Sequence, residues 1–284
     1  MTSWHPVQLQ LTTDLGRGGR WTSLRAAGRE WLWTNPDPAI AAARVHVGPG
    51  DAFVDAGGGE ECFPCLRAPH DHGLVWNRPW RRNGDLASVS AEGHHLTRVV
   101  QRPPQAADAA LVVTYTVSAD TGRDVLHATH LLLHLSEAAE LHPGPHGPLV
   151  FLDPRPDAEI DALGGEQAWV RALGRGRRGA VCYLLPDCVT VTVTDGDDAL
   201  RLTLDADPGV PLAFVVWRNL AGWPADAPYR SIGVEPALGK DVSLPPARPG
   251  DAMRVGPDAP VTWRLTLEAL RRDGSGPTDG PPAC

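Results

Sequence analysis

Residues 57–80, GGGEECFPCLRAPHDHGLVWNRPW, concentrate the side chains that could do chemistry. This short segment carries two acids, a His-Asp-His run and two tryptophans: Glu60, Glu61, His70, Asp71, His72, Trp76 and Trp80. The mixture is too polar for a plain core and too aromatic for a plain loop. Aromatic faces stack on sugar rings, and carboxylates and imidazoles hydrogen-bond to sugar hydroxyls. The segment therefore predicts one wall of a pocket.

Two patterns in this segment raise the question of a metal site. Cys62-Phe-Pro-Cys65 is a C-x-x-C, but zinc would want a second close pair, and Cys182 and Cys188 are too widely spaced. His70-x-His72 would place two imidazoles on one strand face, as in cupins, but the glutamate expected a few residues later is missing. We therefore expect no metal, no cofactor and buried, inert thiols.

The elements that must position these residues are short strands. Residues 189–194, VTVTVT, alternate strictly between apolar and polar, and 200–204, LRLTL, follow after a short turn, so the two should form a hairpin. Similar runs recur along the chain, and helical periodicity is almost absent. Together with 30 glycines and 28 prolines, this predicts an all-β fold, a large antiparallel β-sandwich. No linker divides it, so we expect one domain over residues 1–270 and a disordered C-terminal tail over 271–284.

Composition argues against several classes of function. The net charge is −8 and the pI about 5.7, which disfavours a nucleic-acid surface. No stretch approaches 18 apolar residues, and the first residues lack a basic region followed by an apolar run. Five cysteines, an odd count, do not look like a disulfide framework. We expect a cytoplasmic monomer or homodimer whose partner is a small molecule, not nucleic acid or a membrane.

Three segments in order resemble the aldose 1-epimerase (galactose mutarotase-like) superfamily. Residues 18–24 (GGRWTSL) and 28–33 (GREWLW) look like its opening hairpin. Glu61-Cys-Phe-Pro64 followed by Asp71-His-Gly-Leu-Val-Trp76 is similar to the ECFP and DHG-x-x-W segments of its uncharacterised bacterial branches. Gly233-Val-Glu-Pro236 resembles the late EP segment that holds the family's catalytic glutamate. The resemblance implies the supersandwich fold and an enzyme that interconverts sugar anomers.

That reaction needs an acid and a base. A base removes the proton of the anomeric hydroxyl while an acid protonates the ring oxygen, and a carboxylate and a histidine on opposite sides of the sugar would suit this. The resemblance implies that Glu235 is the base and that His72 binds the sugar. The acid is expected among His127, His130 and His134, of which His130 is the closest match.

The remaining expectations concern the ligand. The substrate-binding set is His72, Asp71, Glu61, Trp76, Arg78 and Trp33, and Trp76, His72 and Glu61 should converge on one concave surface. Residues 74–76 (LVW) stand where the sugar-phosphate branch has an arginine, which disfavours a phosphosugar. Two alternatives stay open: a non-catalytic carbohydrate-binding protein, and an isomerase or lyase of specialised metabolism that uses the same pocket. A histidine facing Glu235 across the cleft would favour the enzyme.

Overall fold

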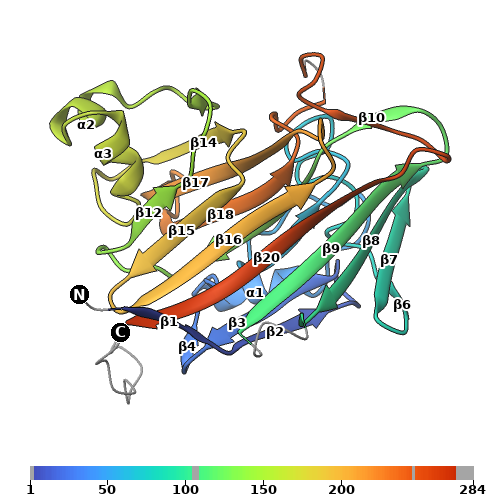
Figure 1. Ribbon diagram of the computed structural model, residues 1–284, viewed down its shortest axis with the longest axis horizontal. Coiled ribbons are helices and arrows are strands. Elements are labelled where there is room, and N and C mark those ends of the chain that lie inside the picture. The colour runs from blue at the N-terminus through green and yellow to red at the C-terminus, as the bar shows by residue number, and fades with distance from the viewer. Residues whose placement is uncertain (1–2, 104–108, 245–246, 273–284) are drawn as a thin grey trace.

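The computed structural model describes residues 3–103, 109–244 and 247–272. Within these ranges the chain forms two large antiparallel sheets (Figure 1). Their inner faces share one hydrophobic core, to which both sheets contribute alternate residues such as Val113 and Val117 from one sheet and Leu131 and Val234 from the other. The prediction of a large antiparallel β-sandwich is confirmed.

The first sheet has the strand order β12-β15-β16-β20-β9-β8-β7-β6, and β1 pairs with β20. Its strands are β1 (Trp4–Val7), β6 (Arg81–Asn83), β7 (Leu86–Ala91), β8 (His94–Gln101), β9 (Ala110–Ala119), β12 (Glu140–Pro143), β15 (Thr190–Asp195), β16 (Asp198–Ala206) and β20 (Val261–Arg272). The hairpin expected from the VTVTVT run is confirmed, because β15 and β16 pair from Thr190 opposite Thr203 to Asp195 opposite Asp198.

The second sheet has the order β13-β14-β17-β18-β11-β5-β3-β2, and β4 pairs with β3. Its strands are β2 (Leu9–Asp14), β3 (Arg20–Ala26), β4 (Arg29–Glu30), β5 (Gly59–Cys62), β11 (His127–Leu133), β13 (Val150–Phe151), β14 (Ala180–Pro186), β17 (Leu212–Trp223) and β18 (Tyr229–Leu238). A separate ribbon joins β10 (Arg123–Val125) to β19 (Met253–Val255).

The central strands of the second sheet, β5, β11 and β18, are buried on both faces over most of their length. A second apolar cluster covers part of its outer face and includes Cys62, Ala128, Cys182, Val215 and Ala237. Each of these residues alternates along its strand with residues of the main core, as the two-residue period of a strand requires. Loops and α1 (Pro38–Arg44) cover this face, whereas α2 (Asp157–Ala162) and α3 (Glu166–Arg171) lie together at one end of the molecule (Figure 1).

The structure refines the boundaries expected from the sequence. Residues 34–56 contain α1, and residues 136–165 contain β12, β13 and α2. Strand β20 ends at Arg272, two residues into the tail that was expected to be disordered. Arg271 donates a 2.8 Å hydrogen bond to Asp198 on β16, which extends the pairing. Residues 273–284 lie outside the described residues.

Candidate functional site

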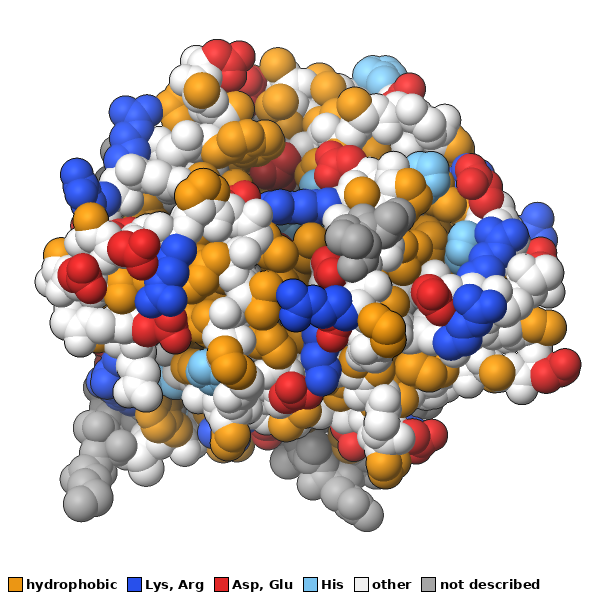
Figure 2. Space-filling model, turned by 90° about the horizontal axis from the view of Figure 1, so that it is seen from above, with side chains coloured by type: hydrophobic (Ala, Val, Ile, Leu, Met, Phe, Trp, Pro, Cys, Tyr) orange, Lys and Arg blue, Asp and Glu red, His pale blue; other side chains and the backbone are white. Residues whose placement is uncertain are grey.

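A cavity of about 820 Å³ opens on the outer face of the second sheet. Its floor comes from β5, β11, β18, β17 and β14, and its walls come from α1 and from loops on either side of β5. The lining mixes ionisable and aromatic side chains: Phe53, Asp55, Cys62, Arg67, Asp71, His72, His130, Asp153, Cys182, Trp217, Trp223, Tyr229 and Glu235. Figure 2 shows a hollowed face where hydrophobic side chains surround acidic, basic and histidine side chains.

Cross-strand pairing places three ionisable side chains in one row on the outer face of the sheet, two of which, His130 and Glu235, line the cavity. His130 on β11 is paired with Glu60 on β5. On its other side, β11 is registered with β18 so that Leu132 is opposite Gly233 and Ala128 opposite Ala237, which puts His130 opposite Glu235. Directly opposed residues project to the same face of a sheet. Nδ1 of His130 lies 2.9 Å from Oε1 of Glu235.

The environment of this pair favours its charged form. The side chains of His130 and Glu235 are 12% and 4% exposed. Burial by itself lowers the pKa of His130, but the adjacent Glu235 carboxylate outweighs it, and Asp55 and Glu60 add to the effect. The pKa of His130 is consequently raised from its ordinary value to about 9. At neutral pH the pair is therefore an imidazolium beside a carboxylate.

Gly233 makes room for the Glu235 carboxylate. A Cβ at this position would lie 2.8 Å from Oε1 of Glu235 and 3.2 Å from Cδ2 of Leu132. The Glu235 side chain therefore leans back along its own strand over Gly233 toward His130. This explains locally why a glycine stands two residues before the glutamate in the Gly-Val-Glu-Pro segment.

A tight turn delivers His72 to the same place. His72 and Gly73 both have left-handed backbone, with φ of 58° and 76°. Any Cβ on Gly73 would lie 2.4 Å from the carbonyl oxygen of Phe63, so glycine is required there. The ring centroids of His72 and His130 are 4.9 Å apart, and Phe53 stacks on His72 at 3.4 Å.

Asp71 stands beside His72 at the rim of the cavity. Its Oδ1 lies 3.1 Å from Nδ1 of His72, and its side chain is 66% exposed. Burial lowers the pKa of His72, and the Asp71 charge partly opposes that shift. The two predicted substrate-binding residues Asp71 and His72 therefore both line the cavity.

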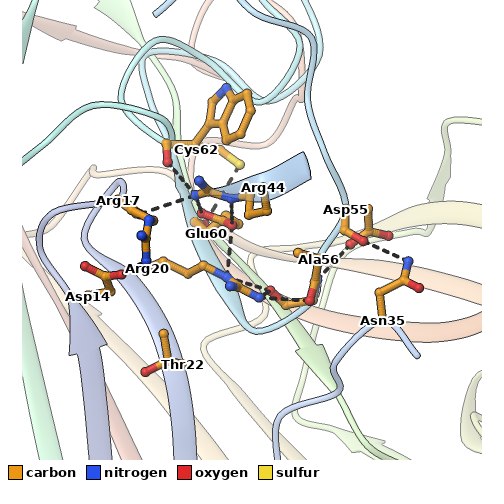
Figure 3. Close-up of polar contacts among 12 residues, drawn as sticks. Asp14, Arg17, Arg20, Thr22, Asn35, Arg44, Asp55, Ala56, Glu60 and Cys62 are labelled. Atoms are coloured by element: carbon orange, nitrogen blue, oxygen red, sulfur yellow. Dashed lines mark hydrogen bonds and ion pairs between the residues drawn. The ribbon is translucent and has the colours of Figure 1, made fainter. Parts of the chain in front are cut away.

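Beside the cavity, on the same outer face of the sheet, a buried ion cluster fixes the wall to the sheet (Figure 3). Arg44, the last residue of α1, donates from Nε and Nη2 to the two carboxylate oxygens of Glu60, each at 3.0 Å. Nε of Arg20 on β3 lies 3.1 Å from the same carboxylate. Burial raises the pKa of Glu60, although the positive charges of Arg44 and Arg20 act in the opposite direction. The cluster anchors α1, from which Ile40 and Ala43 line the cavity.

Glu61 does not lie in the cavity, contrary to the expectation that it binds substrate. Because it follows Glu60 on β5, it points to the opposite face, and it is fully buried between the sheets. There its carboxylate accepts hydrogen bonds from Arg98 at 2.5 Å and Tyr115 at 3.0 Å and pairs with His127 at 3.2 Å. Glu61 therefore organises the core.

The other predicted binding residues lie behind or beside the cavity. Trp76 is 2% exposed, with the Arg44 guanidinium 5.0 Å from its ring. Arg78 donates from Nε to the carbonyl of Leu74 in its own loop at 2.9 Å. Trp33 is 9% exposed and stacks at 5.4 Å on Tyr229, which does line the cavity. Trp76 and Trp33 therefore support pocket residues from behind, and Glu61, Trp76 and His72 do not share one surface.

The three candidate histidines separate cleanly. His127 faces the core and is fully buried, and His134 is exposed beyond the end of β11. Only His130 of the three lines the cavity.

Several lining residues were missed from the sequence. Phe53 and Asp55 lie in a Gly- and Pro-rich loop that has no periodic pattern. Trp217 alternates with core residues along β17, a signal that was readable once the strand was placed. Trp223 is the last residue of β17 and Tyr229 is the first residue of β18. Both line the cavity because the two strands pair at that end.

Metal and thiol chemistry find little support in the described part of the chain. Within it, no group of three or more His, Cys, Asp or Glu side chains is placed to hold a metal ion. Cys62, Cys65, Cys182 and Cys188 are free and buried. Burial raises the pKa of the Cys62 and Cys182 thiols, which both line the cavity, and this disfavours reactive thiolates. No helix among the described residues is long and apolar enough to span a membrane.

Comparison with solved structures gives near full-length matches. The Slr1438 protein from Synechocystis sp. PCC 6803 matches with a TM-score of 0.65 and 13% identity, over 95% of this chain and 96% of that one. A galactose mutarotase-like protein from Lactobacillus casei matches with a TM-score of 0.59 and 15% identity, over 94% and 100%. A galactose mutarotase related enzyme from Lactobacillus acidophilus matches with a TM-score of 0.58 and 11% identity, over the full length of both chains.

At these identities the comparisons show the fold, which is that of galactose mutarotase-like and aldose 1-epimerase homologues. No family model matches the sequence, and no curated protein matches it. The chemistry of the cavity must therefore be argued from its own residues.

Proposed function

We propose that the protein is an aldose 1-epimerase-like enzyme that interconverts the anomers of a free sugar, with Glu235 as general base and His130 as general acid. The observation that carries the proposal is the 2.9 Å imidazolium–carboxylate pair on the floor of an open cavity. The names of structural neighbours, a galactose mutarotase-like protein and a galactose mutarotase related enzyme, support the same class of substrate.

The placement of the pair suits the reaction. The sequence argument expected base and acid on opposite sides of the sugar, whereas His130 and Glu235 lie side by side on adjacent strands. The two oxygens that exchange protons, the anomeric hydroxyl oxygen and the ring oxygen, are bonded to the same carbon. Neighbouring acid and base can therefore reach both of them from one face of the floor.

The protonation state of the resting pair also fits ring opening. The Glu235 carboxylate accepts the proton of the anomeric hydroxyl while the His130 imidazolium donates a proton to the ring oxygen. The bond between the anomeric carbon and the ring oxygen breaks, and an open-chain aldehyde forms. After rotation about the adjacent carbon–carbon bond, neutral His130 takes the proton back as the hydroxyl attacks the aldehyde. Glu235 returns its proton to the former carbonyl oxygen, which closes the cycle.

His72 and Asp71 have the supporting role in this proposal. The His72 ring stands 4.9 Å from the His130 ring, and its pKa is lowered by burial, so it is a neutral hydrogen-bonding group near pH 7. Because its Nδ1 is buried and lies 3.1 Å from Asp71, its Nε2 is the ring nitrogen left to exchange one hydrogen bond with a sugar hydroxyl. Asp71 at the rim can accept from a further hydroxyl. Together they would hold the ring over the acid–base pair.

Polarimetry of freshly dissolved α-glucose and α-galactose tests the proposal. Glu235→Gln keeps the shape and removes the base, so it should slow anomerisation about 10²–10⁴-fold while binding stays nearly unchanged. His130→Asn should do the same, and the double variant should be little worse than either single one. Glu268→Gln on β20, in the other sheet, is the matched control and should keep the full rate.

Two outcomes would contradict the proposal in different ways. If Glu235→Gln keeps full activity, Glu235 is not the general base. If the unaltered protein anomerises no free aldose faster than the spontaneous rate, the proposed enzymatic activity is wrong. The protein would then bind sugars without converting them.

A further inference from the structure

One carboxylate in the cavity has no role in the proposed acid–base pair. Asp55, in the loop between α1 and β5, lines the cavity and is half-buried. Its Oδ2 accepts a 2.7 Å hydrogen bond from the Tyr229 hydroxyl, and its Oδ1 accepts one from the backbone N–H of Gly57 at 3.3 Å. Both partners are neutral, and within the described residues the carboxylate has no ion pair.

The neighbouring cations are already engaged. Arg20 interacts electrostatically with Asp55, but it forms its ion pair with Glu60, at 3.1 Å. Arg20 also donates hydrogen bonds to the carbonyl oxygens of Ala56 and Gly57 (Figure 3). Arg67, which also lines the cavity, lies 3.6 Å from Asp153. Asp55 therefore presents a half-buried negative charge to the cavity with no compensating cation in contact.

Aromatic side chains extend from the contact between Asp55 and Tyr229 along the lining of the cavity. Tyr229 and Trp223 meet edge to face at 5.9 Å, and Trp223 and Trp217 do so at 6.1 Å. Trp33 stacks behind Tyr229 and fixes its ring. Trp223 is 48% exposed, although it is large and apolar. A carboxylate beside several aromatic rings held at angles to one another is an arrangement that suits an organic cation, which is attracted both to the charge and to the ring faces.

The wider charge of the cavity points the same way. Four carboxylates line it, those of Asp55, Asp71, Asp153 and Glu235, against one arginine and two histidines. Because burial lowers the pKa of His72, that ring adds no positive charge near neutral pH. An anionic substrate such as a sugar phosphate would meet net repulsion, and a cationic one would meet net attraction.

We propose that Asp55, together with Tyr229, Trp223 and Trp217, forms a recognition site for an ammonium group, so that the cavity selects an amino sugar. This inference rests on the proposed function for the reactive end of the sugar, which lies over His130 and Glu235. Asp55 is then a specificity-determining residue that binds the amino substituent and takes no part in the proton transfers.

Calorimetric titration at about pH 6, where an amine is protonated, tests the site with three probes. Glucosamine carries the ammonium group, N-acetylglucosamine carries a bulkier uncharged group at the same carbon, and glucose carries a hydroxyl. We expect glucosamine to bind at least about tenfold more tightly than the other two. Asp55→Asn should remove that preference. Glu268→Gln, which neutralises a carboxylate on β20 in the other sheet, should keep it.

A second variant guards against a folding defect in Asp55→Asn, because that residue ties its loop to Tyr229. Trp223→Ala removes an exposed ring, so it should fold normally and should lower the ratio of glucosamine affinity to glucose affinity severalfold. Equal affinity for glucosamine and glucose would overturn the proposal. So would an Asp55→Asn variant that weakens both equally, since that result describes a hydroxyl ligand.

Anomerisation of the same probes, followed by proton NMR, separates this inference from the proposed function. Tight, Asp55-dependent binding of glucosamine without anomerisation would refute the enzyme and keep the ammonium site. Anomerisation of glucose and glucosamine with equal kcat/KM and equal affinity would keep the enzyme and refute the ammonium site.

Discussion

Two glutamate–histidine pairs lie on opposite faces of the same sheet. On the core face, Glu61 and His127 approach to 3.2 Å and are both fully buried. On the cavity face, Glu235 and His130 approach to 2.9 Å and keep slight exposure. Strand β11 contributes to both faces, because His127 and His130 are three residues apart. Its alternation places the pair with Glu61 of β5 on the core face and the pair with Glu235 of β18 on the cavity face.

The difference lies in what else each carboxylate contacts. Glu61 also accepts hydrogen bonds from Trp21, Arg98, Tyr115 and Thr129. Burial opposes its ionisation, but His127 and Arg98 outweigh burial and lower its pKa. Glu235 has no such second set of partners among the described residues. A carboxylate with filled hydrogen-bonding capacity holds structure, and one with capacity left beside an open cavity can accept a proton from a ligand.

The largest effect that follows from this comparison is on stability. Glu61→Gln should lower the free energy of unfolding by about 3–5 kcal/mol, because it leaves the Arg98 guanidinium, 2% exposed, without its counter-charge. Glu235→Gln should cost much less, since the cavity admits water to His130. Urea unfolding followed by tryptophan fluorescence measures both, with Glu268→Gln as the control for the chemical change. If Glu61→Gln and Glu235→Gln lose the same free energy of unfolding, both pairs are structural.

The second prediction concerns pH. The pKa of His130 is raised to about 9 in the folded protein, so its pair stabilises the fold fully below the ordinary histidine value near 6.5. That stabilisation is lost as the pH rises through 9. The rate of anomerisation should fall at higher pH, by about tenfold per pH unit above 9, because the general acid loses its proton there.

His130→Asn separates the two parts of this prediction. The free energy of unfolding of this variant should not decline between pH 6.5 and 9 as that of the unaltered protein does. Its residual rate of anomerisation should not fall above pH 9. A decline that persists in His130→Asn would assign the titration to another group.

The sequence predicted the fold well because strand signals are local. Alternation marked β15 and β16 and their turn, and most long strands lay where their patterns were. The shorter strand β5 was hidden, because GEEC is buried on both faces and shows no alternation. Glu61, a residue of this strand, was consequently assigned to the wrong face. Whether a strand residue points to core or cavity depends on register with its partners, which a single sequence does not contain.

The site was predictable only in part, for the same reason. Glu235, His130, His72 and Asp71 came from short motifs, and the structure brings them to one cavity. Asp55, Trp217, Trp223 and Tyr229 join them from a loop and a hairpin end far away in the sequence. Their convergence depends on how β17 and β18 pair and on where α1 holds its loop. No local pattern records those contacts.

The third prediction tests the supporting role of His72. His72→Asn keeps one donor and one acceptor but shortens the side chain, so it should weaken sugar binding by about tenfold, the equivalent of one hydrogen bond of roughly 1–1.5 kcal/mol. The turnover number should change little, since the acid–base pair stays in place. Initial rates over a range of sugar concentrations give KM and kcat separately. A loss confined to kcat would instead place His72 in the proton transfers.

The smallest effect should come from Gly233→Ala, which sharpens the comparison by testing whether the reactive carboxylate needs its open space. The added Cβ would stand 2.8 Å from Oε1 of Glu235, so the carboxylate must rotate away from His130. A side chain pushed about 30° from its preferred rotamer costs roughly 0.5–1.5 kcal/mol, which corresponds to about a 2- to 10-fold loss in kcat. Gly179→Ala is the matched control, because its nearest contact would be the carbonyl oxygen of Arg177 at 3.9 Å. If Gly233→Ala keeps the full rate and a stable fold, the position of the Glu235 carboxylate over this glycine does not matter for proton transfer, and the distinction between the filled core pair and the open cavity pair loses its mechanistic meaning.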